Sequence, residues 1–310
     1  MWWQSCARPL IPLVLLAALA VSPADAQSTD TSRFPERVLL TNDNGIDDAG
    51  LVELARAFAR VPGTEVYVVA STRDRSGTSN FLGATAGAGR YRVERRDLGP
   101  GIEAWALHGF PADCVIFALT GPLRDRAPDL VVSGINGGPN TGDDWFGSGT
   151  IGAARTAAYF GVPAVAVSGL EDDHPGAVAA ATDWVVRFAR SGLVASLAAP
   201  QYLTVSLPVG TPPDVTGARI VERARGTIWG RSSPIDAVAD ADSVVEWRFE
   251  LRRYPERAAP GTDVPTVADG YIVIVPMRVD EFDAALADRL RGAADEIPEW
   301  SAVDADPGHR

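Results

Sequence analysis

Three groups of oxygen-bearing side chains follow apolar runs of strand length in this sequence. They are Asn42, Asp43 and Asn44 after the run 37–41, Ser76 in the polar stretch after 65–70, and Asn136 at the end of 129–136. Open parallel sheets bind ligands beyond the carboxyl ends of their strands, so these side chains are expected together at one sheet edge. The alternative for Asp43 and Asn44 is that they only cap the next helix, although one residue would suffice for that.

The shared chemistry of these side chains predicts a site for a hard cation. Carboxylate, hydroxyl and amide oxygens suit magnesium, manganese or calcium, and few protein groups are needed when phosphate and water complete the coordination shell. Zinc prefers histidine and cysteine, and His108, His174 and His309 show no ligand spacing. The sequence therefore favours a magnesium- or manganese-type site.

An anion pocket is predicted beside that cation. Ser148, Gly149 and Thr150 open an alanine-rich segment that is expected to be helical up to about residue 160. The first backbone N–H groups of a helix and its dipole favour a bound phosphate. The alternative is that a hydroxyl there acts only as an ordinary N-cap.

Composition excludes several classes of function. The chain has 310 residues, a formal net charge of −12 and no lysine, so a P-loop is ruled out. The acidic balance argues against a nucleic-acid duplex as partner, because no basic field is available to displace counterions. Of the two cysteines, Cys6 lies near the start, and Cys114 sits in an apolar run where it is expected to be a buried small side chain.

Strand and helix patterns alternate from residue 37 to about 197 and predict an α/β fold. A helix is expected over 48–60, where apolar residues recur at helical spacing. The later part is less regular. Alternation over 243–251 predicts a strand with one buried face, and the acidic tail 296–310 is expected to be loosely ordered.

The first 26 residues have the pattern of a secretory signal peptide. An apolar stretch precedes Ala24-Asp25-Ala26, whose small residues predict a cut after Ala26. A membrane anchor is the alternative, but it needs about 18 or more apolar residues, and this stretch is interrupted by Pro12. We expect an exported protein with no membrane anchor after processing, in the periplasm first and the medium second.

Five spaced segments resemble the SurE family of metal-dependent 5′/3′-nucleotidases. They are residues 40–46, 75–77, 109–115, 133–142 and 148–150, with further similar pieces at 205–208, 261–263 and 270–276. The resemblance implies a three-layer Rossmann-like, mostly parallel sheet with a smaller β-rich oligomerisation extension. The expected domain covers 34–295, with the core over about 36–200 and the extension over about 201–295, and it should assemble as a homodimer or homotetramer.

The same resemblance assigns roles to residues. The implied ligands of one magnesium or manganese ion per subunit are Asp43, Asn44, Ser76 and Asn136. The implied catalytic residues are Asp43 and Asn44. The implied phosphate or substrate contacts are Asn42, Asn136, Ser148, Gly149 and Thr150. The chain departs from the family at Asn44, which stands where a second aspartate is usual and removes one negative charge from the site.

The expected reaction is hydrolysis of nucleoside 5′- and 3′-monophosphates by a metal-activated water. One alternative is a secreted metal- or nucleotide-binding homologue that lost turnover through Asn44. Another is a phosphatase that acts on phosphorylated sugars or polyphosphate. The sequence leaves both alternatives open.

Overall fold

The computed structural model describes residues 34–86, 89–170, 176–208, 215–235, 247–280 and 283–292. The predicted signal peptide 1–26 and the tail 296–310 lie outside these ranges. The strands are β1 (Arg37–Thr41), β2 (Glu65–Ser71), β3 (Val93–Arg96), β4 (Ile102–Leu107), β5 (Leu130–Gly137), β6 (Ala164–Leu170), β7 (Gln201–Ser206), β8 (Gly217–Ile220), β9 (Ile228–Pro234), β10 (Trp247–Arg253) and β11 (Tyr271–Arg278).

The helices are α1 (Ala49–Ala59), α2 (Gly83–Ala86), α3 (Pro111–Thr120), α4 (Gly149–Tyr159), α5 (Ala177–Ala189), α6 (Gly192–Ala195), α7 (Asp263–Ala268) and α8 (Ala284–Arg291), with the 3-10 turns η2 (Gly142–Phe146) and η3 (Pro255–Arg257). Within the described ranges, the helices are all too short or too polar to cross a bilayer.

A nine-stranded sheet with the order β3-β4-β2-β1-β5-β6-β7-β11-β8 forms the centre of the described chain. Its neighbours run parallel except in the pairs β3–β4 and β7–β11. This confirms the predicted mostly parallel α/β fold. Strands β2, β1 and β5 are adjacent, so the three polar segments that follow or end them meet at one edge, as the sequence predicted.

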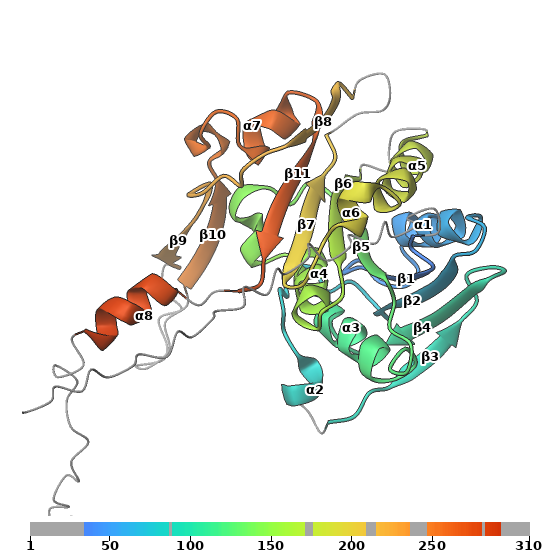
Figure 1. Cartoon of the computed structure of the whole chain (residues 1–310). Coiled ribbons are helices and arrows are strands. Elements are labelled where there is room, and N and C mark those ends of the chain that lie inside the picture. Colours follow the sequence, from blue (N-terminus) through green and yellow to red (C-terminus); the bar gives the residue numbers. More distant parts are fainter. Residues whose placement is uncertain are drawn as a thin grey trace, which may run out of the picture. The chain divides into compact units, whose positions relative to one another are not determined.

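Helices cover both faces of the sheet, which gives the predicted three layers (Figure 1). Side chains of β1 alternate between the two cores, because successive strand residues point to opposite faces. Val38 and Leu40 pack with residues of α1 and α5. Leu39 packs with residues of α3 and α4 on the other face.

Helix α1 illustrates how the sequence pattern builds these layers. Leu51, Leu54 and Phe58 are fully buried, as their helical spacing predicts. The side chain of Asp48 accepts a hydrogen bond from Leu51 N at 3.0 Å and caps the helix. On the opposite layer Cys114 is fully buried, as expected, and burial raises the pKa of its thiol to about 12.

A two-stranded antiparallel ribbon of β9 and β10 stands apart from the large sheet. The prediction of one buried face over 243–251 is wrong for the described part of this strand. Trp247, Phe249 and Leu251 are 59%, 64% and 55% exposed. The alternation is present in the sequence, but the described part of the chain supplies no layer to cover that face of β10.

Candidate active site

A cavity of about 450 Å³ opens at the carboxyl ends of β1, β2 and β5. Three predicted metal ligands, Asp43, Ser76 and Asn136, line it together with Ser148 at the start of α4. These residues come from four separate places in the sequence, and the order of the parallel strands brings them together.

Asp43 is nearly buried, with 3% of its surface exposed. Its Oδ1 accepts a 2.6 Å hydrogen bond from the Thr150 hydroxyl, and its Oδ2 accepts a 3.1 Å bond from Thr150 N. Burial raises the pKa of Asp43, and both bonds from Thr150 oppose that rise because they favour the ionised form. Gly149 permits this close approach, since a Cβ there would lie 2.8 Å from the Asp43 Cβ. Gly149 and Thr150, predicted as phosphate contacts, are thus seen packing against Asp43.

Ser76 and Asn136 are positioned by local hydrogen bonds. Ser76 donates through its hydroxyl and its backbone N–H to Asp74 Oδ1, both at 2.7 Å. The Asn136 amide nitrogen donates to Gly137 O at 2.9 Å and to Gly138 O at 3.3 Å, which leaves its amide oxygen as the acceptor for a ligand. The pairing of β5 with β6 shifts its register between Ser133 and Asn136, next to this side chain.

Asp74 is a site residue that the sequence analysis did not single out. Its negative charge contributes to the raised pKa of Asp43, and it orients Ser76. The sequence feature that could have identified Asp74 is its position two residues before Ser76, in a polar loop that follows a strand.

Asn42 and Asn44 have different surroundings. Asn42 is fully buried, and its Oδ1 accepts a hydrogen bond from Gly45 N at 3.1 Å, so it shapes the turn after β1. Gly45 has φ +117°, a conformation that favours glycine. Asn44 is not among the described residues that line the cavity. Its Oδ1 is buried without a hydrogen-bond partner in the described part of the chain.

Other buried polar atoms near these strand ends also lack partners within the described ranges. They are Thr41 Oγ1, Asn42 Nδ2 and Ser133 Oγ. A buried polar group without a partner costs about 1–3 kcal/mol, and such groups call for an explanation such as a water, an ion or a catalytic role. Together with Asn44 Oδ1, these atoms leave four polar groups at the strand ends available to bind water or a ligand.

The donor set fits a hard divalent cation. Asp43, Ser76, Asn136 and the unpartnered Asn44 Oδ1 all offer oxygen, which magnesium and manganese prefer. The described ranges contain no group of three or more His, Cys, Asp or Glu side chains placed to hold a metal ion. Asp143 and Asp144 also line this cavity, and their carboxylates accept hydrogen bonds from Thr227 N and from Arg253 respectively.

Ser148 serves two purposes at the start of α4. Its Oγ accepts a hydrogen bond from Ile151 N at 3.2 Å, so the N-cap interpretation is confirmed. It also lines the cavity. The positive end of the helix dipole faces Asp43, whose carboxylate accepts the Thr150 N–H, and the prediction of a phosphate here stays a prediction.

The remaining wall of the cavity was missed by sequence reasoning. It includes Phe146, Ile228, Leu251 and Arg253. These residues come from η2, β9 and β10, which are far apart in sequence, and no local pattern links them.

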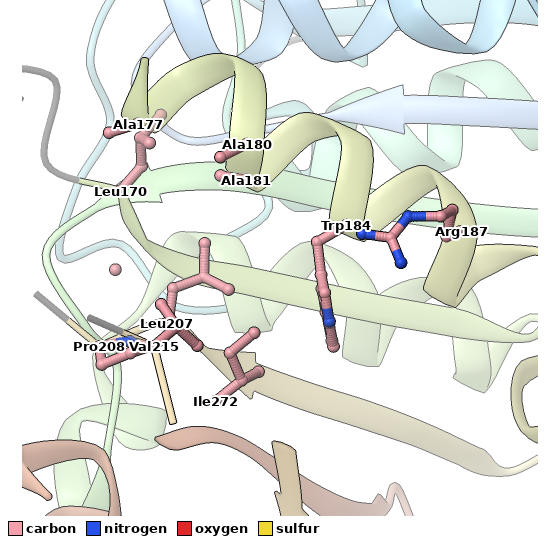
Figure 2. A pocket seen from close by; sticks show the side chains of 11 residues that line it. Leu170, Ala177, Ala180, Ala181, Trp184, Arg187, Leu207, Pro208, Val215 and Ile272 are labelled. Carbon is pink, nitrogen blue, oxygen red and sulfur yellow. The ribbon is translucent and has the colours of Figure 1, made fainter. Parts of the chain in front are cut away.

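A second cavity, of about 110 Å³, lies between α5 and nearby strand ends (Figure 2). Its described lining is apolar apart from Arg187, whose Nε donates to Asp183 Oδ2 at 2.9 Å. Trp184 and Leu207 project into it. The described lining of this second cavity offers no carboxylate, hydroxyl or thiol.

The fold and the first cavity define a Rossmann-like α/β protein with an oxygen-rich site beyond parallel strands. Residues 38–229 match the family described as Survival protein SurE. The chain is 34% identical over 270 residues to 5′-nucleotidase SurE 1 of Burkholderia lata, covering 84% of this chain and 98% of that protein. It is 38% identical over 249 residues to 5′-nucleotidase SurE of Xanthomonas campestris pv. campestris, covering 79% and 90%.

Among solved structures, the SurE protein from Aquifex aeolicus is similar in fold, with a TM-score of 0.67 and 24% identity. The match covers 84% of this chain and all of the other. The chain therefore belongs to the SurE family, as the sequence resemblance predicted.

Proposed function

We propose that this protein is a 5′-nucleotidase that uses a divalent cation, magnesium or manganese, to hydrolyse nucleoside 5′- and 3′-monophosphates. The names of its relatives in Burkholderia lata and Xanthomonas campestris support the nucleotidase activity. The observation that carries the proposal is the buried Asp43 at a cavity shared with neutral oxygen donors and the N-terminus of α4. The oxygen donors suit a divalent cation, and the helix N-terminus suits a phosphate beside it.

Each residue of the site has a defined task in this proposal. Asp43, Ser76 and Asn136 would hold the cation, with Asn44 Oδ1 as a further ligand. When bound, the cation supplies Lewis-acid polarisation of the phosphoryl group. Thr150 keeps Asp43 oriented and favours its ionised form. The N-terminus of α4 attracts the phosphate.

The test is a phosphate-release assay over nucleoside 5′- and 3′-monophosphates, sugar phosphates and polyphosphate, with and without Mn²⁺. We expect manganese-dependent turnover of nucleotides. Asp43→Asn should reduce kcat/KM by more than about 100-fold, because the anionic ligand is lost while the side-chain shape is kept. Asp47→Asn is the matched control, since Asp47 sits on the same loop and pairs with Arg96 at 3.5 Å.

If the Asp43→Asn variant hydrolysed nucleotides as fast as the wild type under saturating Mn²⁺, the site assignment would be wrong. Nucleotide binding without any phosphate release would support the non-catalytic alternative instead. Equal or faster release from sugar phosphates or polyphosphate would favour the other phosphatase alternative.

We also propose that the protein is exported to the periplasm and assembles as a homodimer or homotetramer. The signal-peptide pattern of residues 1–26 supports the first proposal. The exposed side chains of Trp229, Trp247 and Phe249 in the β9–β10 ribbon, which are not among the described residues lining the cavity, support the second.

A further inference from the structure

We infer that Phe146, Ile228 and Leu251 form an apolar wall that binds the aromatic base of the substrate, with Arg253 at its edge. This inference rests on the proposed function and narrows its substrate class. It predicts that the enzyme prefers phosphomonoesters in which a single sugar separates the phosphate from a planar aromatic ring. Sugar phosphates without a base fill only the polar part of the cavity.

The lining of the cavity combines a polar part with an apolar part. The polar side chains are Asp43, Ser76, Asn136, Asn140, Asp143, Asp144 and Ser148. The apolar wall and Arg253 complete the lining. The whole cavity, about 450 Å³, falls within the range of about 300–1,000 Å³ that is typical of sites for small organic ligands. A bare phosphate would leave the apolar part empty.

The wall is exposed although it is made of large apolar side chains. Phe146 is 73% exposed and Leu251 is 55% exposed. Neither contributes to the two hydrophobic cores of the described chain. Exposed apolar surface beside polar groups is typical of a ligand site.

Specific bonds from Asp143 and Asp144 hold the three parts of the wall together. The Asp143 carboxylate accepts hydrogen bonds from Thr227 N at 2.7 Å and from Ile228 N at 3.4 Å, which ties η2 to the start of β9. Asp144 Oδ1 accepts from Arg253 Nη2 at 2.9 Å and from Arg253 Nε at 3.2 Å, which ties η2 to the end of β10.

The turn that carries Phe146 is itself firmly anchored. The ring of its neighbour Trp145 contacts two guanidinium groups, with Arg155 Cζ 4.8 Å and Arg223 Cζ 4.9 Å from the ring centroid. Arg155 Nη2 also donates to Trp145 O at 3.0 Å. Asp263 Oδ2 accepts from Gly142 N at 2.8 Å at the other end of the turn. The Phe146 ring is therefore presented on a rigid support, which lowers the entropy cost of binding.

The spacing of the wall from the phosphate region matches a nucleotide. Phe146 and Ser148 are two residues apart, so their α-carbons are at most about 7–8 Å apart. A single sugar spans the gap between a phosphate at Ser148 and a ring at Phe146. An aromatic platform of this kind contributes about 1–3 kcal/mol per stacked base, or about 5- to 100-fold in affinity. It tolerates different bases because each has an aromatic face.

Arg253 adds a cation at the edge of the wall. Its ion pair with Asp144 holds the guanidinium beside the cavity, and 66% of its side chain is exposed. A guanidinium can stack on a base or donate to its ring acceptors. Arg253 thereby gives the wall a polar edge as well as an apolar face.

The experiment compares AMP with ribose 5-phosphate, which keeps the sugar and the phosphate but lacks the base. For the wild type, KM for ribose 5-phosphate should exceed KM for AMP by about tenfold. Phe146→Ala should raise KM for AMP at least five times more than KM for ribose 5-phosphate, with kcat for AMP changed less than twofold. Phe146→Trp should keep the wild-type ratio, because it retains an aromatic face.

Tyr159→Ala is the matched control, since Tyr159 is also 73% exposed but is not among the described residues lining the cavity. It should leave both KM values unchanged. Leu251→Ala, on β10, is an independent check. Like Phe146→Ala, it should raise KM for AMP more than KM for ribose 5-phosphate. Equal KM values for the two substrates in the wild type, or an equal rise for both in Phe146→Ala, would overturn the inference.

The measurements distinguish failure of the base-binding inference from failure of the nucleotidase proposal. If neither compound is hydrolysed, the nucleotidase proposal fails, and Kd values for the same pair are then measured by calorimetry in Mn²⁺. Tighter binding of AMP that is lost in Phe146→Ala supports the base-binding wall even without turnover. Equal Kd values for the two ligands overturn it.

Discussion

At the scale of single residues, Asp43 and Thr150 form the centre of the site. The hydroxyl and the backbone N–H of Thr150 both donate to the Asp43 carboxylate. Burial is the largest influence on the pKa of Asp43 and raises it, and the Thr150 hydroxyl is the largest opposing one. In the proposed function, the balance between these two effects sets the pH at which Asp43 becomes available as an anionic ligand.

Thr150→Val should therefore move the acidic limb of the pH–activity profile to higher pH. Valine has nearly the same shape but no hydroxyl, so the pKa of Asp43 rises further. Because the ionised carboxylate is the active form, activity is lost as pH falls through that pKa, and a higher pKa means loss at a higher pH. The measurement is kcat/KM against pH at a fixed, subsaturating Mn²⁺ concentration.

Thr150→Ser is the matched control, since serine keeps the hydroxyl and should keep the wild-type limb. The explanation is wrong if Thr150→Val leaves the acidic limb in place or moves it toward lower pH.

Asn44 is a further ligand in the proposed function, although it is not among the described residues that line the cavity. Its Oδ1 is buried without a hydrogen-bond partner in the described ranges. Asn44→Asp adds a unit charge near the cation, and the Coulomb attraction at about 4 Å is on the order of 4 kcal/mol at an effective dielectric of 20. The cost of burying that charge offsets part of the gain. We expect the Mn²⁺ concentration for half-maximal activity to fall by about tenfold.

Manganese titration of the wild type and Asn44→Asp measures this change. Peptide mass spectrometry of residue 44 is the necessary control, because the Asn44-Gly45 pair is prone to deamidation and aged protein would contain aspartate. An unchanged or higher manganese requirement in the variant would mean that Asn44 is not a cation ligand.

At the scale of elements, the β9–β10 ribbon carries exposed apolar side chains that a monomer does not need. Trp229 and Trp247 are 69% and 59% exposed. Exposed apolar patches of this kind are typical of interaction sites. A second copy of the chain would supply the missing cover, in agreement with the predicted oligomerisation extension.

Light scattering of the mature protein at micromolar concentration should therefore give the mass of two or four chains. Trp247→Glu should shift the mass toward one chain, because it places a charge in the apolar contact. Leu193→Glu, at a residue that is 55% exposed on α6, is the control and should leave the mass unchanged. A monodisperse monomer of the wild type would contradict the prediction.

At the scale of the whole molecule, the signal-peptide pattern of residues 1–26 supports the proposed export. When the full chain is expressed in a Gram-negative host, intact-mass measurement of the periplasmic fraction should show a protein that begins at Gln27. Ala26→Leu should block processing, because the cleavage site needs a small residue. Ala18→Leu, in the apolar stretch, is the control and should still be processed. Recovery of an unprocessed wild-type chain from the cytosol would refute export.

Local patterns in the sequence were sufficient for the mostly parallel α/β core and for part of the site. Helical spacing placed α1, and apolar runs ending in polar residues placed Asp43, Ser76 and Asn136 at one edge. These predictions succeed because hydrophobic periodicity and strand-end chemistry are encoded within a few neighbouring residues.

Other properties depended on contacts between distant segments. Only the tertiary structure pairs Thr150 with Asp43, 107 positions apart, and Arg253 with Asp144, 109 positions apart. It also leaves the alternating strand β10 exposed, because alternation shows which residues share a face and not whether anything covers that face. The sequence by itself determined the residue types at the strand ends, whereas burial, pairing and the apolar wall arose from chain topology, which brings together segments that no local pattern connects.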